Sequence, residues 1–485
     1  MFSLFRFGKK KRVYDARPLS LYDTLSTQKK VFAPLSQKQV TLYTCGPTVY
    51  DYATIGNFRS YVFADTLKRT LVYNDYTVNH TINLTDFGHL TSDADEGEDK
   101  MMKGLKREGR PVTLTAMREL ADGYIEAFQH DMDSLNILPP TQYTRASDFV
   151  REQIALIKTL EDKGYTYETS DGVYFDVSKF PTYGKLGKIN LDTLKDGARV
   201  EINPEKKHPA DFALWKKGLL GWDSAWGKGF PGWHIECTAM AFASLGKQVD
   251  IHTGGIDHIA THHNGEIAQA EAATKKTYVQ TWMHNAFITV EDRRIGKSEG
   301  NAIILRQLKD RGYQQSTYRY WLLTGHYRSP MNFTFEALDG AKQALFKIKR
   351  FVFEDTVSTD GHVVVPYQKR FHEAVNDDLD TPKAIAILWE LLKDESLPKE
   401  DRIATLKDMD RVLGLGLNEA RDTAARELGI ISPEDVPEEV QKLIDEREAA
   451  RVARNWEQAD LLREAINLKG YTLEDTPNGP KVSKS

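Results

Sequence analysis

The chain contains very little cysteine, with two residues among 485. So small a number cannot build the disulfide framework of a secreted protein, and it indicates a reducing, cytoplasmic compartment. The sequence also lacks any apolar run long enough to cross a bilayer, so we expect no membrane association. Its 40% hydrophobic and 28% charged residues are ordinary for a globular protein.

A large excess of positive charge is missing too. The formal net charge is −5, which excludes binding to nucleic acid through overall charge, so a polyanionic partner must meet a local basic patch. One such patch is the basic run at 9–12, within a predicted flexible tail over residues 1–17. Its charges follow a short apolar stretch instead of preceding a long one, which is not the order of a secretory signal. The run is either solvated or in contact with RNA.

Periodicity from about residue 40 predicts alternating strands and helices. An apolar strand over 40–45 is followed by a helix over 57–73, a second strand over 76–84 and a helix over 113–134. A β-α-β start of this kind favours a parallel, doubly wound sheet and places this part of the chain in the α/β class.

The next segment has a different pattern. A helix over 147–163 precedes a hairpin signal around 170–172, which is best explained as an α+β insertion into the first domain. The sheet pattern then resumes with a strand over 248–252, a helix over 262–275 and a strand over 278–290.

Beyond residue 302 the chain is nearly all helical. Its last predicted helix, over 438–468, carries Arg447, Arg451 and Arg454 on one face. Such a stripe is either solvated or bound to RNA. The total length suggests three or four domains.

Both cysteines occur where a metal site could be built. Cys45 ends the first apolar strand and Cys237 closes the stretch 231–236, so we expect both at the ends of sheet strands. Further along, His262 and Glu266 are spaced by one helical turn, which puts them on one face of a helix. Two thiolates, an imidazole and a carboxylate form a plausible zinc site. The alternative is that each cysteine is a small buried hydrophobic residue.

Two loops have the character of a nucleotide site. The tetrapeptide Thr-Ile-Gly-Asn at 54–57 opens the helix after the first strand, where unpaired N–H groups and the helix dipole favour an anion. The stretch 294–301 holds Lys297 beside Ser298 in a glycine-bearing loop, which suits a clamp on phosphates in a transition state. Taken singly, each segment is weak evidence, because most such tetrapeptides are plain helix starts and most polar loops with lysine are solvated.

Six motifs occur in one order along the chain. They read Cys-Gly-Pro-Thr-Val-Tyr-Asp from position 45, Ile-Gly-Asn from 55, Gly-Trp-His-Ile-Glu-Cys from 232, His-x-Gly-Gly-x-Asp from 252, His-His-x-x-Glu-Ile-Ala-Gln from 262, and Lys-Ser-x-Gly-Asn from 297. Together they closely resemble the cysteinyl-tRNA synthetases, a family of class I aminoacyl-tRNA synthetases. The resemblance runs from about residue 18 to the C-terminus and includes the segments 378–382 and 455–460.

The resemblance implies one zinc ion per chain, held by Cys45, Cys237, His262 and Glu266. In this family the metal takes the thiolate of the substrate as an added ligand and so selects cysteine. Serine carries a harder and much less acidic hydroxyl group, so direct coordination rejects it without a separate editing site. The positions that match the wall of the amino-acid pocket are Gly46, Thr85 and Trp233.

The resemblance also implies an ATP site, with Mg²⁺ accompanying the ATP. Thr54 stands where the first signature usually has histidine, and Arg294-Ile295-Gly296 replace the start of the lid signature Lys-Met-Ser-Lys-Ser. These departures bear on the rate more than on the type of reaction. The implied catalytic residues are Lys297, Thr54 and Asn57. The implied ATP-binding residues are Thr54, Gly56, Asn57, Gly254, Gly255, Asp257 and Lys297.

The implied reaction uses ATP to join L-cysteine to tRNA(Cys), and nothing in the sequence requires more than a monomer. The implied architecture is a Rossmann-type catalytic domain over residues 18–134 and 231–290, with a connective-peptide insertion over 135–230. There follow a stem-contact region with the lid loop (291–345), a helical bundle that binds tRNA (346–427) and a small anticodon-binding domain (428–485).

Two other functions stay open on the sequence. A cysteine ligase that acts on a small aminosugar has the same catalytic half but lacks the C-terminal helical region. A catalytically inactive paralogue that binds tRNA or zinc would account for Thr54 and the altered lid signature. The complete set of four implied zinc ligands together with Lys297 counts against this alternative.

Overall fold

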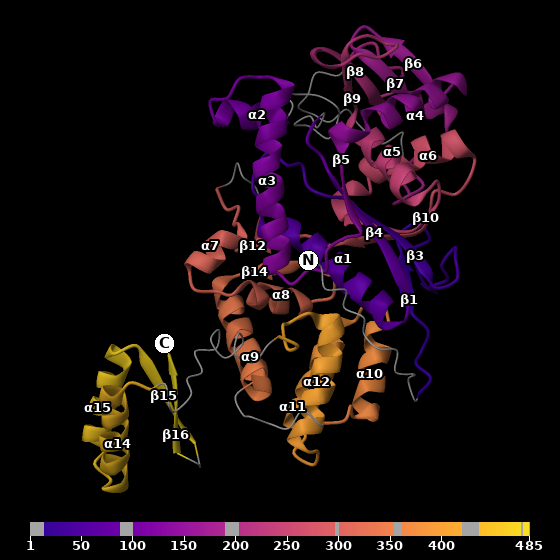
Figure 1. The fold of residues 1–485 in the computed structure, drawn as a ribbon. Helices are drawn as coiled ribbons and strands as arrows, with labels where there is room; N and C mark the ends of the chain where they lie inside the picture. The colour runs from indigo at the N-terminus through magenta and orange to yellow at the C-terminus, as the bar shows by residue number, and fades with distance from the viewer. Residues whose placement is uncertain are drawn as a thin grey trace. The chain divides into compact units, whose positions relative to one another are not determined.

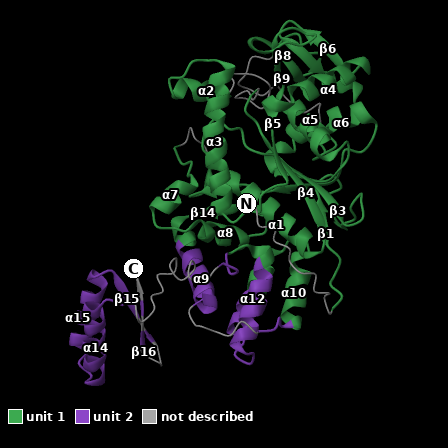
Figure 2. Cartoon of the chain, viewed as in Figure 1, with its two compact units in different colours: residues 1–338, 365–387, 411–415 green, residues 339–364, 388–410, 416–485 purple. Residues whose placement is uncertain are grey.

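The computed structural model describes residues 14–87, 100–189, 203–295, 300–353, 361–419, 436–476 and 479–484 (Figure 1). The basic run at 9–12 lies outside these ranges, as do Lys297 and Ser298 of the lid signature. The chain divides into two compact units, residues 1–338, 365–387 and 411–415, and residues 339–364, 388–410 and 416–485 (Figure 2). None of the described helices is both long and apolar enough to span a bilayer.

A five-stranded parallel sheet forms the centre of the first unit. The strands are β3 (Gln39–Thr44), β4 (Thr77–Leu84), β5 (Gln142–Arg145), β10 (Val249–Gly255) and β11 (Val279–Asn285). Their order is β11-β10-β3-β4-β5, and all neighbouring pairs are parallel. The chain passes from β3 to β4 on one side and reaches β10 on the other, so the strand order reverses beside β3. The predicted doubly wound α/β fold is confirmed, and ligands of such folds bind outside the carboxyl ends of the strands at this point.

Helices pack on both faces of this sheet because side chains alternate along each strand. Val40 and Leu42 of β3 pack with Phe63 of α1 (Ile55–Tyr73). Tyr43, which points to the opposite face, packs in a cluster with Ile267 of α6 (His262–Thr274). The same cluster contains Cys237 of α5 (Trp233–Leu245). The face covered by α5 and α6 therefore lies directly beside the candidate metal ligands.

The insertion forms a separate antiparallel sheet of four strands in the order β6-β7-β8-β9. Its elements are α4 (Val150–Asp162), β6 (Thr166–Thr169), β7 (Gly172–Phe175), β8 (Phe212–Trp222) and β9 (Gly229–Pro231). The hairpin expected around residues 170–172 is present as β6-β7. Phe175 and Phe212 stack at 5.1 Å between ring centroids, and Trp215 is fully buried. These three side chains belong to a core cluster that also contains residues of α5 and α6, so the insertion packs on these two helices. β5 belongs to the central sheet although it lies within the segment 135–230.

The remaining helices and strands surround these two sheets or form the second unit. They are β1 (Ser20–Asp23), β2 (Gln28–Val31), α2 (Lys100–Arg107), α3 (Leu114–Ser134), β12 (Ile288–Val290), β13 (Arg293–Arg294), α7 (Leu305–Asp310), α8 (Gln315–Leu323), β14 (Met331–Phe333), α9 (Phe335–Phe353), α10 (Val365–Val375), α11 (Thr381–Lys393), α12 (Lys399–Leu413), α14 (Glu438–Val452), α15 (Trp456–Leu468), β15 (Tyr471–Thr476) and β16 (Gly479–Lys484). Short 3₁₀ turns occur at Ala146–Phe149, Val177–Lys179 and Ile256–His258.

Two predicted elements are each split in two. The strand expected over 278–290 is β11 and β12, and β12 leaves the central sheet to pair with β13 and β14. The helix expected over 438–468 is α14 and α15, separated at Arg454, whose φ of 57° lies in the left-handed region. Asn455 then accepts a hydrogen bond from the backbone N–H of Gln458 and begins α15. The prediction of one continuous helix is wrong.

The arginine stripe serves the fold of the C-terminal hairpin. Arg447 is buried and donates to both carboxylate oxygens of Asp475 in β15, at 2.8 and 3.0 Å. Arg451 also pairs with Asp475, and Arg454 lies in the turn between α14 and α15. The interpretation of the stripe as a solvated face is therefore wrong for Arg447.

A buried charge cluster joins α1 to α8. Asp65 of α1 pairs with Arg69 at 2.7 Å and with Arg319 of α8 at 2.5 Å, and all three side chains are buried. Arg319 also donates to the carbonyl oxygen of Leu413 at 2.7 Å. Burial alone would raise the pKa of Asp65, but the charges of Arg69 and Arg319 lower it. The carboxylate is therefore the stable form in the folded protein.

Asp65→Asn is expected to lower the free energy of unfolding by about 3–5 kcal/mol, because it removes the buried carboxylate with which two buried guanidinium groups pair. The pKa of Asp65 is lower in the folded than in the unfolded state, so its contribution is complete above the unfolded-state pKa and is lost as the pH falls through the folded-state pKa. Denaturant unfolding at neutral pH and near pH 3 measures both effects. Asp148→Asn, at the exposed pair with Arg118, is the control and should cost less than about 1 kcal/mol.

Candidate active site and metal centre

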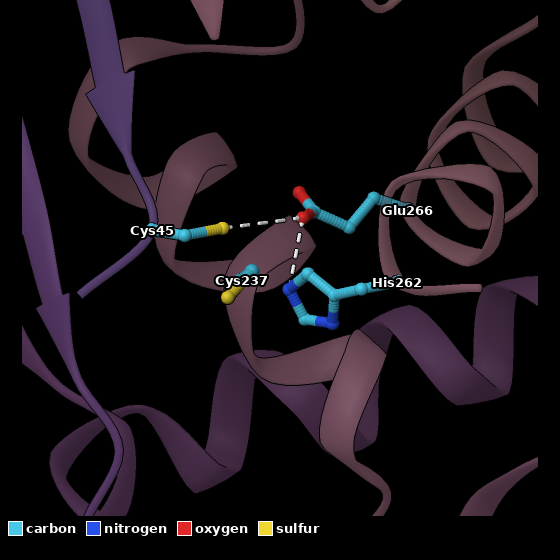
Figure 3. A group of neighbouring side chains, drawn as sticks. All are labelled: Cys45, Cys237, His262 and Glu266. Atoms are coloured by element: carbon cyan, nitrogen blue, oxygen red, sulfur yellow. Dashed lines mark hydrogen bonds and ion pairs between the residues drawn. The ribbon is translucent and has the colours of Figure 1, made fainter. Parts of the chain in front are cut away.

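Four side chains predicted as metal ligands converge in the first unit (Figure 3). Cys45 directly follows β3, while His262 and Glu266 lie one turn apart at the start of α6. Cys237 lies within α5, so the expectation that it ends a strand is wrong. All four residues are buried, and one ligand atom from each lies within 4.8 Å of the others. The structure thus brings together residues that are up to 221 positions apart.

Close backbone packing allows this convergence. The N–H of Cys45 donates to the carbonyl oxygen of Thr253 in β10 at 3.1 Å, which fixes the end of β3. A Cβ at Gly46 would lie 1.6 Å from the carbonyl oxygen of Asn83, and one at Gly254 would lie 2.7 Å from the ring of His263. Both positions therefore require glycine for steric reasons.

A second set of possible ligands shares two members with the first. It consists of Cys45, His252, His263 and Glu266, again with ligand atoms within 4.8 Å of one another. His263 Nε2 lies 3.3 Å from Cys45 Sγ, and His252 Nε2 lies 3.0 Å from Glu266 Oε2. His263 Nδ1 is 2.8 Å from His284 Nε2, so its second nitrogen has a partner inside the protein.

His252 and His263 were not predicted from the sequence as neighbours of the site. A signal was present, because six of the thirteen histidines fall between residues 234 and 284. His234 also belongs to this group, with its Nδ1 2.9 Å from that of His262. This contact orients the His262 ring, as partners of metal-binding histidines commonly do.

The electrostatics of the site suit a cation. Burial alone would raise the pKa of Cys45, but a hydrogen bond with Cys237 and the nearby histidines hold it well below its usual value. Burial and Cys45 raise the pKa of Cys237. Burial opposes charge on His262, yet Cys45 and Glu266 raise its pKa to about 10. Burial would raise the pKa of Glu266, but neighbouring histidines lower it to about 2. A divalent cation therefore meets a thiolate and a carboxylate and displaces the remaining protons as it binds.

The first set fits zinc. Zinc prefers four ligands drawn from thiolate sulfur, imidazole nitrogen and carboxylate oxygen, which is the composition found here. The second set has one thiolate and two imidazoles, and the second nitrogen of one imidazole is bonded to His284. Two thiolates make the first set the softer and the more selective for zinc.

The predicted wall of the amino-acid pocket lies beside these ligands. Trp233 begins α5 and is half-buried, with its ring centroid 4.6 Å from that of His262. Thr85 follows β4 and donates to Glu236 Oε1 at 2.7 Å, and Glu236 is next to Cys237 in α5. Gly46 adjoins Cys45. Gly46 and Trp233 therefore border the candidate metal centre, and Thr85 is linked to it through Glu236.

The predicted ATP residues that the structure describes lie at the start of α1 and at and just after the end of β10. Thr54 to Asn57 form the start of α1, after β3, while Gly254 and Gly255 end β10, which pairs with β3. Asp257 follows in an exposed turn. Thr54 is buried, and both its backbone N–H and its hydroxyl donate to Asn57 Oδ1, at 2.8 and 2.9 Å. Lys297 lies outside the described residues, while Arg294 ends β13.

Comparison with known proteins decides the family. The model of the class I (C) tRNA synthetase catalytic domain matches residues 31–343, and that of the DALR domain matches residues 370–418. The chain is 46% identical over 472 residues to cysteine–tRNA ligase 1 of Burkholderia lata, covering 96% of this chain and 97% of that one. The chain belongs to the cysteine–tRNA ligase family. The cysteine–tRNA ligase of Treponema denticola is 40% identical over 487 residues, covering 94% of this chain and 98% of that protein.

Solved structures agree with the family at the level of the fold. A methionyl-tRNA synthetase of Mycobacterium tuberculosis, in complex with methionyl-adenylate, superposes with a TM-score of 0.57 at 14% identity, covering 82% of this chain and 95% of that one. A leucyl-tRNA synthetase of Agrobacterium radiobacter gives 0.58 at 11% identity, covering 83% and 86%. The chain therefore shares the fold of these class I synthetases.

Proposed function

We propose that the protein activates L-cysteine with Mg²⁺-ATP to cysteinyl-AMP and pyrophosphate, and then transfers the cysteinyl group to the 3′ end of tRNA(Cys). The observation that carries this proposal is the buried set Cys45, Cys237, His262 and Glu266 at the carboxyl end of a doubly wound sheet. Membership in the cysteine–tRNA ligase family supports it.

The metal centre is proposed to select cysteine over other amino acids. Zinc held by the four ligands supplies a soft Lewis acid that binds a thiolate far better than a hydroxyl group. The chain's own residues set the rest of the pocket. His234 orients His262, and Trp233 lies against the same ring. Thr85 holds the side chain of Glu236 through a hydrogen bond, which limits the conformational freedom of these residues before a substrate binds.

Adenylate formation is proposed to take place at the start of α1. The dipole of α1 favours the phosphates of ATP at this end of the helix. The N–H groups of Ile55 and Asn57 already donate to the carbonyl oxygens of Ile303 and Thr54. Thr54 uses its N–H and its hydroxyl to hold the oxygen of Asn57, which leaves the amide NH₂ as the end of Asn57 that donates to ATP. Gly254, Gly255 and Asp257 are proposed to bind the ribose, and Lys297 to stabilise charge on the pentacoordinate phosphate.

Thr54→Val is expected to lower the kcat of cysteine-dependent pyrophosphate exchange about 3- to 10-fold, because it removes one hydrogen bond to Asn57 at nearly constant volume. Thr54→Ser keeps the hydroxyl and should remain close to the parent. A Thr54→Val enzyme with unchanged kcat would show that the hydroxyl has no part in positioning Asn57.

The regions beyond the catalytic domain are proposed to bind tRNA. These are the stem-contact region (291–345), the helical bundle (346–427) and the C-terminal domain (428–485). The match of the DALR domain model within the second of them supports this division. We propose that a monomer carries out both steps.

Pyrophosphate exchange with cysteine, with and without tRNA, tests the proposed function. The proposal predicts exchange that depends on cysteine and acylation of tRNA(Cys). Exchange without acylation of tRNA would instead favour a cysteine ligase that acts on a small aminosugar. The absence of exchange would favour an inactive paralogue that binds zinc or tRNA.

A further inference from the structure

Arg59 is a buried cation that has no part in the proposed binding of zinc, cysteine or ATP. It lies in the second turn of α1, one turn after Ile55, and is only 4% exposed. Burial lowers the pKa of its guanidinium to about 10, so the group stays charged at neutral pH. No carboxylate pairs with it in the described part of the chain. A buried charge without a counter-ion is costly unless its N–H groups are satisfied.

Backbone carbonyl groups satisfy this guanidinium. Nη1 donates to the oxygen of Phe287 at 2.7 Å, and Nη2 donates to the oxygens of Tyr327 at 3.2 Å and His326 at 3.3 Å. Nη2 also donates to the oxygen of Ser329. Phe287 directly precedes β12, and residues 326–329 lead from α8 into β14. The fork of Arg59 thus contacts both of the segments that enter this small sheet.

Two of these carbonyl groups also join the two segments to each other. The oxygen of Phe287 accepts the N–H of Met331 at 3.2 Å, and the oxygen of Tyr327 accepts the N–H of Ala286 at 2.9 Å. Arg59 therefore binds at the place where β12 and β14 begin to pair. A carbonyl oxygen has two lone pairs, so each can accept both bonds.

Two further hydrogen bonds hold the first residue of α1. The N–H of Ile55 donates to the oxygen of Ile303 at 2.8 Å, and the hydroxyl of Tyr318 donates to the oxygen of Ile55 at 2.6 Å. A Cβ at Gly56 would lie 3.1 Å from Cδ1 of Ile295, just beyond β13. The start of α1, which includes Asn57 and is capped by Thr54, is thus held by Ile303 and by Tyr318 of α8 and lies close to the end of β13.

We propose that Arg59 is a positioning residue for adenylate formation, which holds the start of α1 in register with β12 and β14. The proposal rests on the proposed function, since it assigns Arg59 to the ATP half of that site. Phosphoryl chemistry of this kind depends on placing the reacting groups, and a shift of about 1 Å can cost about 100-fold in rate. Methionine fills a similar volume but donates no hydrogen bond, whereas lysine keeps the charge and loses the planar fork.

The test compares Arg59→Met and Arg59→Lys with Arg69→Met. Arg69 is the matched control, because it lies in the same helix, is also buried, and donates to the backbone oxygen of Asn136 at 2.5 Å. Pyrophosphate exchange gives kcat and the KM values for ATP and cysteine, and thermal unfolding and zinc content are measured on the same samples. All assays are run well below the lowest unfolding midpoint.

The proposal predicts that Arg59→Met lowers kcat by about 100-fold, while the KM for cysteine changes less than about 3-fold and the zinc content is unchanged. The kcat of Arg59→Lys should lie between those of Arg59→Met and the parent. Arg69→Met should keep kcat within about 3-fold of the parent even if its unfolding midpoint drops as far as that of Arg59→Met. Equal kcat losses in Arg59→Met and Arg69→Met would overturn the proposal, as would failure of both Arg59 variants to fold. A parent without cysteine-dependent exchange would overturn the proposed function first, and the role of Arg59 with it.

Discussion

Cys237→Ala is expected to remove zinc from the purified protein and to lower cysteine-dependent pyrophosphate exchange by more than about 100-fold. Loss of an outer-shell partner of a metal commonly costs about 10- to 100-fold, and Cys237 is proposed as a direct ligand. The thiol is buried, so alanine leaves three ligands and a small cavity in place of the fourth. Metal analysis and exchange kinetics on the same preparation measure the two effects.

His263→Gln is the matched control for that variant. His263 belongs only to the second ligand set, whereas Cys237 belongs only to the first. Glutamine keeps a polar group near the position of Nε2, and the variant should retain about one zinc ion per chain. Zinc retained by Cys237→Ala but lost from His263→Gln would place the metal in the second set and contradict the assignment.

Lys297→Ala is expected to lower adenylate formation by about 100- to 1,000-fold with little change in cysteine binding. Removing one preorganised donor to a developing negative charge typically has an effect of this size. Cysteine binding is proposed to depend on the metal centre and Trp233, and Lys297 belongs to neither. Pyrophosphate exchange at saturating ATP gives the rate of adenylate formation, and the KM for cysteine reports the change in cysteine binding.

Lys309→Ala serves as the control for Lys297→Ala. Lys309 is an exposed lysine in α7 and is not among the proposed ATP-binding or cysteine-binding residues, so its removal should leave exchange within about 2-fold of the parent. An unchanged exchange rate in Lys297→Ala would contradict the role given to Lys297.

Much of the catalytic fold could be predicted from the sequence because its signals are local. The apolar run at 40–45 and the helical spacing after it place β3 and α1 to within two residues. His262 and Glu266 could be placed on one helical face from their spacing alone. The order of the six motifs indicated the family, which no single motif could have identified.

The rest of the site could not be predicted because it depends on contacts between distant segments. The stretch before Cys237 reads like the end of a strand, and its position within α5 follows from packing of that helix against the sheet. His252 lies on a strand of unremarkable pattern, and only the tertiary fold brings it within 3.0 Å of Glu266. The break at Arg454 is set by its left-handed backbone and the Asn455 cap, which interrupt an otherwise helical pattern.

The most direct test of the account is X-ray absorption at the zinc edge, measured with and without L-cysteine. The proposed ligands supply two sulfur atoms, each expected at about 2.3 Å from zinc. If the metal selects the substrate through its thiolate, adding cysteine raises the sulfur count from two to three, and adding serine leaves it at two. A sulfur count that does not change with cysteine, or that is one before cysteine is added, would contradict the account.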